Sequence, residues 1–157
     1  MRAIDSLLNE YGESHQNKTN KLIHWICVPV IFWTITGLLW GIKFPFTIPI
    51  IEIPFNAAML ALILAIVYYI RLSIPLAIAL LGFSIICLYI SYIIDTNLWP
   101  GKVWLVSLIA FVIAWIFQFI GHNIEGKKPS FLKDLQFLLV GPAWLMHFIF
   151  KKIGIQY

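Results

Sequence analysis

Charged residues are scarce in this chain of 157 residues: Asp, Glu, Lys and Arg together make up 11% of it, and hydrophobic residues make up 61%. Because soluble domains carry about 25% charged residues, this composition excludes a soluble monomer. At about 20 residues per membrane-spanning helix, four spans would use about half of the chain. No room remains for a separate soluble domain, so any functional site must be built from the spans and their ends.

Other common signals are also missing. The chain has two cysteines, Cys27 and Cys87, and since both lie in apolar runs we interpret them as buried free thiols. The polar N-terminus, with Asp5, Glu10 and Glu13, lacks an apolar core followed by a small-residue cleavage site, so we do not expect a cleaved signal peptide. The net charge of +4 comes from basic residues that flank apolar runs, and we therefore predict no nucleic-acid partner.

The apolar runs predict an all-α membrane protein, with one integral-membrane domain over residues 1–157. We expect four transmembrane helices at about 22–42, 56–71, 74–94 and 103–121. Three prolines and Glu52 after the first span favour an extended or interfacial loop. In residues 131–150, Gly141-Pro142 predicts short helices around a break, in a re-entrant or interfacial segment, with a kinked fifth span as the alternative.

Lysine and arginine positions favour four spans with both termini in the cytoplasm. In that topology the two basic residues outside the cytoplasm are Lys43 and Lys102, and nine are cytoplasmic. A fifth span would move Lys151 and Lys152 outside and reduce the bias to seven against four. We expect membrane lipid around the spans and a bacterial inner membrane as the host, with the endoplasmic reticulum as the alternative.

Three of the four histidines, His15, His24 and His122, then share the cytoplasmic face, and a re-entrant path would bring His147 there as well. Imidazoles at membrane depth are functional candidates, although a single one at a helix end is often only a cap. Together with Glu125 they resemble the ligand sets that hold Fe(II) or Zn(II), so a metal site is favoured.

Spacing restricts how such a site can be built. In one continuous helix His15 and His24 would lie about 13.5 Å apart and on opposite faces, too far to share an ion. We therefore predict a break within Ser14–Asn20. If the break comes before Asn17, then Asn17, Asn20 and His24 line one helix face. The two amides suit contacts to ligands or substrate, or serve as helix caps.

A second set of polar residues lies at the C-terminal end of the fourth predicted span. Gln118, His122 and Glu125 recur at i, i+4 and i+7 on one helix face, and His-x-x-Glu is a two-ligand unit in helical iron proteins. Glu125 could instead pair with Lys127 or Lys128. We interpret those two lysines as a solvated topogenic pair, with attraction of an anionic lipid or fatty acid as the alternative.

The blocks YGESHQNKTNKLIHWICVPV and QFIGHNIEGKKPSFLKDLQFLLVGPAW resemble the two signature blocks of the 2-hydroxy fatty acid dioxygenase family. The resemblance covers essentially the whole chain. It implies a membrane-embedded Fe(II) enzyme of fatty acid α-oxidation, which converts a long-chain 2-hydroxy fatty acid and O2 into the acid one carbon shorter and CO2. The family's positions fall on His15, His24, His122 and Glu125, with Tyr11 in the first block.

Two other functions stay open. A haem protein could use His24 and His122 as axial ligands across the bundle. A non-catalytic lipid transporter or assembly protein would use the histidines only as helix caps.

Overall fold

Helices make up most of the chain, as the apolar runs predict. The computed structural model describes residues 2–49, 52–126 and 131–157. Their elements follow in the order α1 (Ala3–Glu13), α2 (Lys18–Trp40), β1 (Lys43–Ile48), β2 (Ile53–Asn56), α3 (Ala57–Leu72), α4 (Ile74–Ile93), the π-helical turn η1 (Ile94–Leu98), α5 (Val103–Glu125) and α6 (Phe131–Ile153). The helical class is confirmed, and the predicted extended loop forms a hairpin in which β1 and β2 pair antiparallel.

Three of the described helices are long and apolar enough to cross a membrane: Lys18–Trp40, Ile74–Leu98 and Val103–Glu125. They correspond to the first, third and fourth predicted spans. The second, α3, has 16 residues and is about 24 Å long at 1.5 Å per residue, which is shorter than a bilayer core of about 30 Å. The helices are therefore consistent with a membrane protein, with three full-length candidate spans among the described residues where four were expected.

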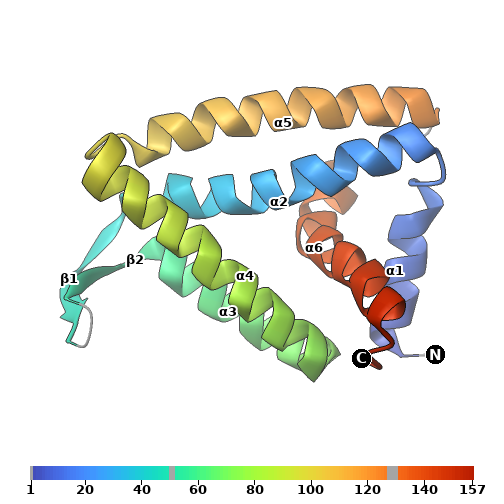
Figure 1. The fold of residues 1–157 in the computed structure, drawn as a ribbon, viewed down its shortest axis with the longest axis horizontal. Coiled ribbons are helices and arrows are strands. Elements are labelled where there is room, and N and C mark those ends of the chain that lie inside the picture. Colours follow the sequence, from blue (N-terminus) through green and yellow to red (C-terminus); the bar gives the residue numbers. More distant parts are fainter. Residues whose placement is uncertain (1, 50–51, 127–130) are drawn as a thin grey trace.

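The helices α2 and α5 lie side by side along the long axis of the molecule and run in opposite directions (Figure 1). Small residues permit this close approach. A Cβ added to Gly37 would lie 1.9 Å from Ser107 Oγ, and a Cβ added to Gly121 would lie 2.4 Å from Asn20 Oδ1. Such small residues are typical of helix contacts within membranes. The pairing brings the last turn of α5 against the first turns of α2.

At that same end of the molecule α1 packs against α6, and the two chain termini lie near each other (Figure 1). Apolar side chains from α1, α3, α4 and α6 share one core, whose most buried members include Ile4, Tyr69, Leu80 and Trp144. The Tyr69 hydroxyl donates to the Leu139 carbonyl oxygen at 2.5 Å and so joins α3 to α6. This core supports α1 and α6 beside the paired ends of α2 and α5.

The prediction of two short helices around a break in residues 131–150 is wrong, because α6 continues through Gly141 and Pro142 as one helix. Packing against neighbouring helices explains why α6 continues through Pro142. A Cβ on Gly141 would lie 3.1 Å from Val28 Cγ1 and 3.2 Å from the Tyr11 hydroxyl, so α1 and α2 press closely on α6 at this point. Tertiary contacts of this kind override the local preference of a Gly-Pro pair. The interfacial or spanning course of α6 stays a prediction.

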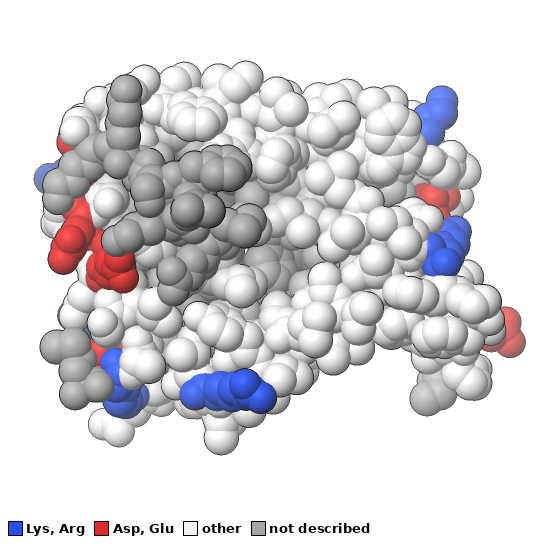
Figure 2. Space-filling view, turned by 180° about the vertical axis from the view of Figure 1, so that it is seen from behind, with Lys and Arg blue, Asp and Glu red and all other residues white. Residues whose placement is uncertain are grey.

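Charged side chains are unevenly placed on the face drawn in Figure 2. Those of the described residues lie toward the two ends and along the lower edge of this face. The hairpin and the start of α5, which carry Lys43 and Lys102, lie at the end opposite α1 (Figure 1). This separation agrees with the predicted charge asymmetry, and the identity of the cytoplasmic side stays a prediction.

Candidate metal centre

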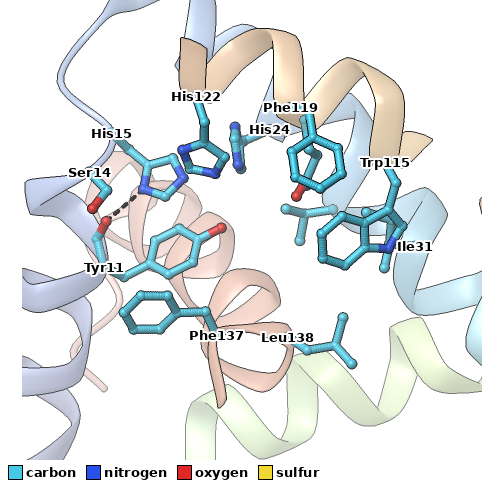
Figure 3. Close-up of a pocket in the computed structure, with 12 residues that line it drawn as sticks. Tyr11, Ser14, His15, His24, Ile31, Trp115, Phe119, His122, Phe137 and Leu138 are labelled. Atoms are coloured by element: carbon cyan, nitrogen blue, oxygen red, sulfur yellow. Dashed lines mark hydrogen bonds between the residues drawn. The ribbon is translucent and has the colours of Figure 1, made fainter. Parts of the chain in front are cut away.

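Three histidines from three separate segments meet at one end of the α2–α5 pair. His15 follows α1, His24 lies in the second turn of α2, and His122 lies in the last turn of α5. Their ring centroids are 4.2 Å apart for His15 and His24, 4.9 Å for His24 and His122, and 5.2 Å for His15 and His122. One ring nitrogen of each lies within 4.8 Å of the others. The predicted clustering of these three histidines is therefore present (Figure 3).

The chain breaks between the first two histidines as the spacing requires. The helix α1 ends at Glu13, and Asn17 begins α2 by accepting hydrogen bonds from the backbone N–H groups of Thr19 and Asn20. Asn17 is therefore an N-cap, one of the two roles expected for it. Because of this turn, His15 folds back onto His24 instead of lying two helical turns away.

Backbone carbonyl groups orient two of the three imidazoles. The Nδ1 atom of His15 lies 2.6 Å from the carbonyl oxygen of Tyr11, and Nδ1 of His24 lies 2.9 Å from that of Asn20. Since a carbonyl group only accepts hydrogen bonds, each Nδ1 carries the proton and each Nε2 keeps its lone pair. Histidine ligands of metals are usually oriented in this way.

Two ring nitrogens of the cluster are buried without a hydrogen-bond partner among the described residues: His15 Nε2 and His122 Nδ1. Leaving a buried polar atom unsatisfied costs about 1–3 kcal/mol, and a bound ion is one of the ways in which such an atom is satisfied. A metal ion bound by the three imidazoles would satisfy the lone pairs that these rings present. The residues present therefore fit a metal ion held by three histidines.

Burial also keeps His15 in the form that binds metals. The side chains of His15 and His24 are 2% and 1% exposed. Desolvation lowers the pKa of His15 to about 4, and the nearby positive charge of Lys21 acts in the same direction. The imidazole of His15 is therefore neutral at neutral pH, and metal binding needs no proton release from it.

The histidines form the polar end of a small, mostly apolar cavity of about 50 Å³. Tyr11 stacks on His15 with ring centroids 4.2 Å apart, and its hydroxyl points across the cavity below the imidazoles (Figure 3). Phe119 lines the cavity and is 62% exposed, so the cavity reaches the outer surface of α5. The other lining residues are Ser14, Val28, Ile31, Trp115, Gln118, Phe137 and Leu138.

A polar groove reaches the same centre from another direction. His15 lines both the apolar cavity and this groove, which runs between α1, α6 and the start of α2. Lys21, Gln16 and Glu13 supply polar groups, and Trp144 forms part of the wall. His15 thus separates an apolar compartment from a polar one, an arrangement that suits an amphipathic ligand.

Glu125 contacts the chain beside the histidines. Its Oε1 accepts a hydrogen bond from the backbone N–H of Gln16 at 2.8 Å. Its Oε2 accepts one from the N–H of Asn17 at 2.9 Å and one from Asn20 Nδ2 at 3.1 Å. The carboxylate therefore binds the turn between α1 and α2, and it is not part of the group of possible metal ligands among the described residues. Its alternative partners, Lys127 and Lys128, lie outside the described residues.

The structure does not bring His147 into the cluster. Its Nδ1 is hydrogen-bonded to the hydroxyl of Tyr157, and its ring lies in the polar groove.

Of the remaining candidates, Gln118 lines the cavity, and Lys127 and Lys128 lie outside the described residues. The sequence interpretation missed Trp115 and Phe119, which precede His122 by seven and three residues and share its helix face.

Replacing His147 with alanine is expected to leave the metal content of the purified protein unchanged, because the side chain lies outside the three-histidine cluster. Elemental analysis of the H147A variant beside the wild-type protein measures this directly. Loss of the metal in H147A would show that the cluster has a fourth ligand.

Comparison with known proteins gives a consistent result. The family model described as "2-hydroxy-palmitic acid dioxygenase Mpo1-like" matches residues 1–153. The chain belongs to the Mpo1-like family. A relative from Saccharomyces cerevisiae named 2-hydroxy-palmitic acid dioxygenase MPO1 is 32% identical over 151 residues, which cover 94% of this chain and 80% of the yeast protein. No solved structure matches the chain. All three clustered histidines lie within the part that the Mpo1-like family model covers.

Proposed function

We propose that this member of the Mpo1-like family is an Fe(II)-dependent dioxygenase that converts a long-chain 2-hydroxy fatty acid and O2 into the acid one carbon shorter, CO2 and water. The observation that carries the proposal is the buried cluster of His15, His24 and His122, with nitrogen lone pairs left unpaired. The relative from yeast is named for a 2-hydroxy-palmitic acid dioxygenase, which supplies the substrate class.

The three imidazoles would hold the ion through one nitrogen each and leave other coordination positions open, as catalytic sites require. When bound, Fe(II) would supply the redox chemistry that O2 needs, together with a position for the carboxylate and hydroxyl oxygens of the substrate. The overall reaction balances without another reductant, because the hydroxy acid itself supplies all four electrons that O2 takes up.

The chain's own residues would bind and orient the two ends of the substrate. The apolar cavity is too small for a long acyl chain, since about 50 Å³ holds only a few water-sized groups. The acyl chain would therefore leave the cavity at Phe119 and lie along the exposed apolar surface of α5. This placement lets a lipid enter from the bilayer while its polar head reaches the histidines. The Tyr11 hydroxyl and Gln118, which line the cavity, would contact the polar head of the substrate.

The geometry is unfavourable to the haem alternative. The ring centroids of His24 and His122 are 4.9 Å apart, which is too close for two imidazoles on opposite faces of a haem iron. A porphyrin between two axial imidazoles needs a wide planar space, and the cavity of about 50 Å³ does not provide it. A purified protein without an intense Soret band is the expected result.

Lys21 is the described basic residue that lines the polar groove beside His15, and we expect it to attract the carboxylate of the substrate. Replacing it with glutamine should raise the KM for 2-hydroxypalmitate about 10-fold, which is the size of one charge-assisted contact of about 1.5 kcal/mol. The matched control is K18Q, because Lys18 carries the same charge one turn earlier on α2, is exposed and does not line the groove. An equal effect of both variants would show only a general loss of surface charge.

Turnover is tested by incubating the purified, Fe(II)-loaded protein with 2-hydroxypalmitate and O2 and by identifying the products. We expect the acid with one carbon fewer and CO2 in equal amounts, and no product from palmitate, which lacks the hydroxyl group. Zinc-loaded protein should be inactive because zinc has no redox chemistry. A shortened acid formed equally well by metal-free protein would contradict the proposal.

A further inference from the structure

Glu125 lies one helical turn beyond His122 on α5, and its carboxylate is hydrogen-bonded to the turn after His15 and to the start of α2. Its three donors among the described residues, the backbone N–H groups of Gln16 and Asn17 and the side-chain amide of Asn20, all belong to the turn after His15 or to the start of α2. The N–H groups at the start of a helix have no partner within the helix and carry a partial positive charge. A carboxylate from α5 therefore satisfies the start of α2.

Asn20 extends this contact to the other side of His15. It is completely buried, and its Nδ2 donates to the backbone carbonyl oxygen of Ser14 and to Glu125 Oε2, at 3.1 Å each. Ser14 precedes His15 and Gln16 follows it, so both neighbours of His15 are tied to the same carboxylate, one directly and one through Asn20. Two flanking bonds fix the backbone position of the residue between them.

The same arrangement fixes the distance between two of the clustered histidines. Glu125 and His122 are separated by three residues on one face of α5, so they move as one rigid unit. Because Glu125 is hydrogen-bonded, directly and through Asn20, to the backbone on both sides of His15, the last turn of α5, which carries His122, also determines the position of His15. Within the part of the chain that the structure describes, the hydrogen bonds to Glu125 are the ones that join the turn at residues 14–17 to α5.

We infer that Glu125 is a positioning residue that holds His15 at the correct distance from His122, and that it is neither a metal ligand nor a proton carrier. This inference rests on the proposed metal site and changes the catalytic role expected from the His-x-x-Glu pattern. Partners that orient metal ligands typically contribute 10- to 100-fold to metal affinity. The loss of Glu125 should therefore weaken the metal without removing any ligand.

The test compares E125Q with the wild-type full-length protein in an anaerobic Fe(II) titration against a coloured chelator. Glutamine keeps the size of the side chain, but its NH2 group faces backbone N–H donors and cannot accept their hydrogen bonds. We expect Fe(II) affinity to fall 10- to 100-fold and kcat to recover at saturating Fe(II). The matched control is E52Q, because Glu52 lies in the hairpin at the far end of the molecule and E52Q should bind Fe(II) like the wild type.

Two results would overturn the inference. Unchanged Fe(II) affinity in E125Q would show that the hydrogen bonds of Glu125 do not place His15. Turnover that stays lost at saturating Fe(II) would show a direct catalytic role of Glu125. If E125Q does not fold, E125D decides, since its shorter side chain keeps the charge but cannot reach all three donors and should lose about 10-fold in affinity. A wild-type protein that binds no Fe(II) would instead reject the proposed function, so the two failures are distinguishable.

Discussion

Single replacement of His15, His24 or His122 with alanine is expected to lower the Fe(II) affinity by at least 100-fold and to abolish turnover of 2-hydroxypalmitate. Each change removes one of three nitrogen ligands, whereas the loss of a residue that merely orients a ligand already costs 10- to 100-fold. Elemental analysis after gel filtration should find about one iron per wild-type chain and almost none in these variants. The measurement needs no substrate, so it separates metal binding from catalysis.

The internal control for these variants is their folded yield. His15 and His24 are buried, and alanine leaves small cavities, so some loss of stability is expected in all three. The proportion of monodisperse, helical protein should therefore be measured on the same samples by gel filtration and circular dichroism. Folded variants that still hold one iron per chain and still form the shortened acid would contradict the assignment of the three ligands.

The second large effect is expected at the contact between α2 and α5. In G121A the new methyl group would lie 2.4 Å from Asn20 Oδ1, so Asn20 must move away from α5. Overpacking of this kind costs about 1–3 kcal/mol of stability. Because Asn20 also binds Glu125 and the Ser14 carbonyl, we expect G121A to lower Fe(II) affinity about 10-fold as well, measured by the same anaerobic titration.

The matched variant is G37A, whose methyl group would lie 1.9 Å from Ser107 Oγ at the other end of the same helix pair. It should destabilise the pair by a similar amount, but it lies far from Asn20 and the histidines. We therefore expect G37A to lose thermal stability and keep its Fe(II) affinity. Equal Fe(II) affinity in G121A and G37A would show that Asn20 does not transmit the packing defect to the site.

Several features of the site could be predicted from the sequence because they depend on local chemistry. The nine-residue separation of His15 and His24 required a break, and the turn-forming residues between them indicated where it falls. The positions of His24 and His122 at the ends of two apolar runs, together with the lysine and arginine asymmetry, predicted that they meet at one end of the molecule. These inferences need only helix geometry and the cost of burying polar groups.

Other features depend on tertiary contacts that no local pattern encodes. The stacking of Tyr11 on His15 and the hydrogen bonds from Glu125 to the turn after His15 arise because α1, α2 and the end of α5 converge. The His-x-x-Glu pattern alone favoured a different role for the glutamate, as a metal ligand. Similarly, Gly141-Pro142 predicted a break that packing against α1 and α2 removes. Only the assembled helices determine these contacts.

Under the proposed function, one Fe(II) held by His15, His24 and His122 would carry out the oxidation of a 2-hydroxy fatty acid by this member of the Mpo1-like family. The most direct measurement is an anaerobic titration of the metal-free protein with Fe(II), followed at each step by O2 uptake and product formation from 2-hydroxypalmitate. We expect both to rise in proportion to bound iron and to saturate at one iron per chain, with one O2 used per shortened acid formed. Saturation with one iron but without O2 uptake or product would contradict the account.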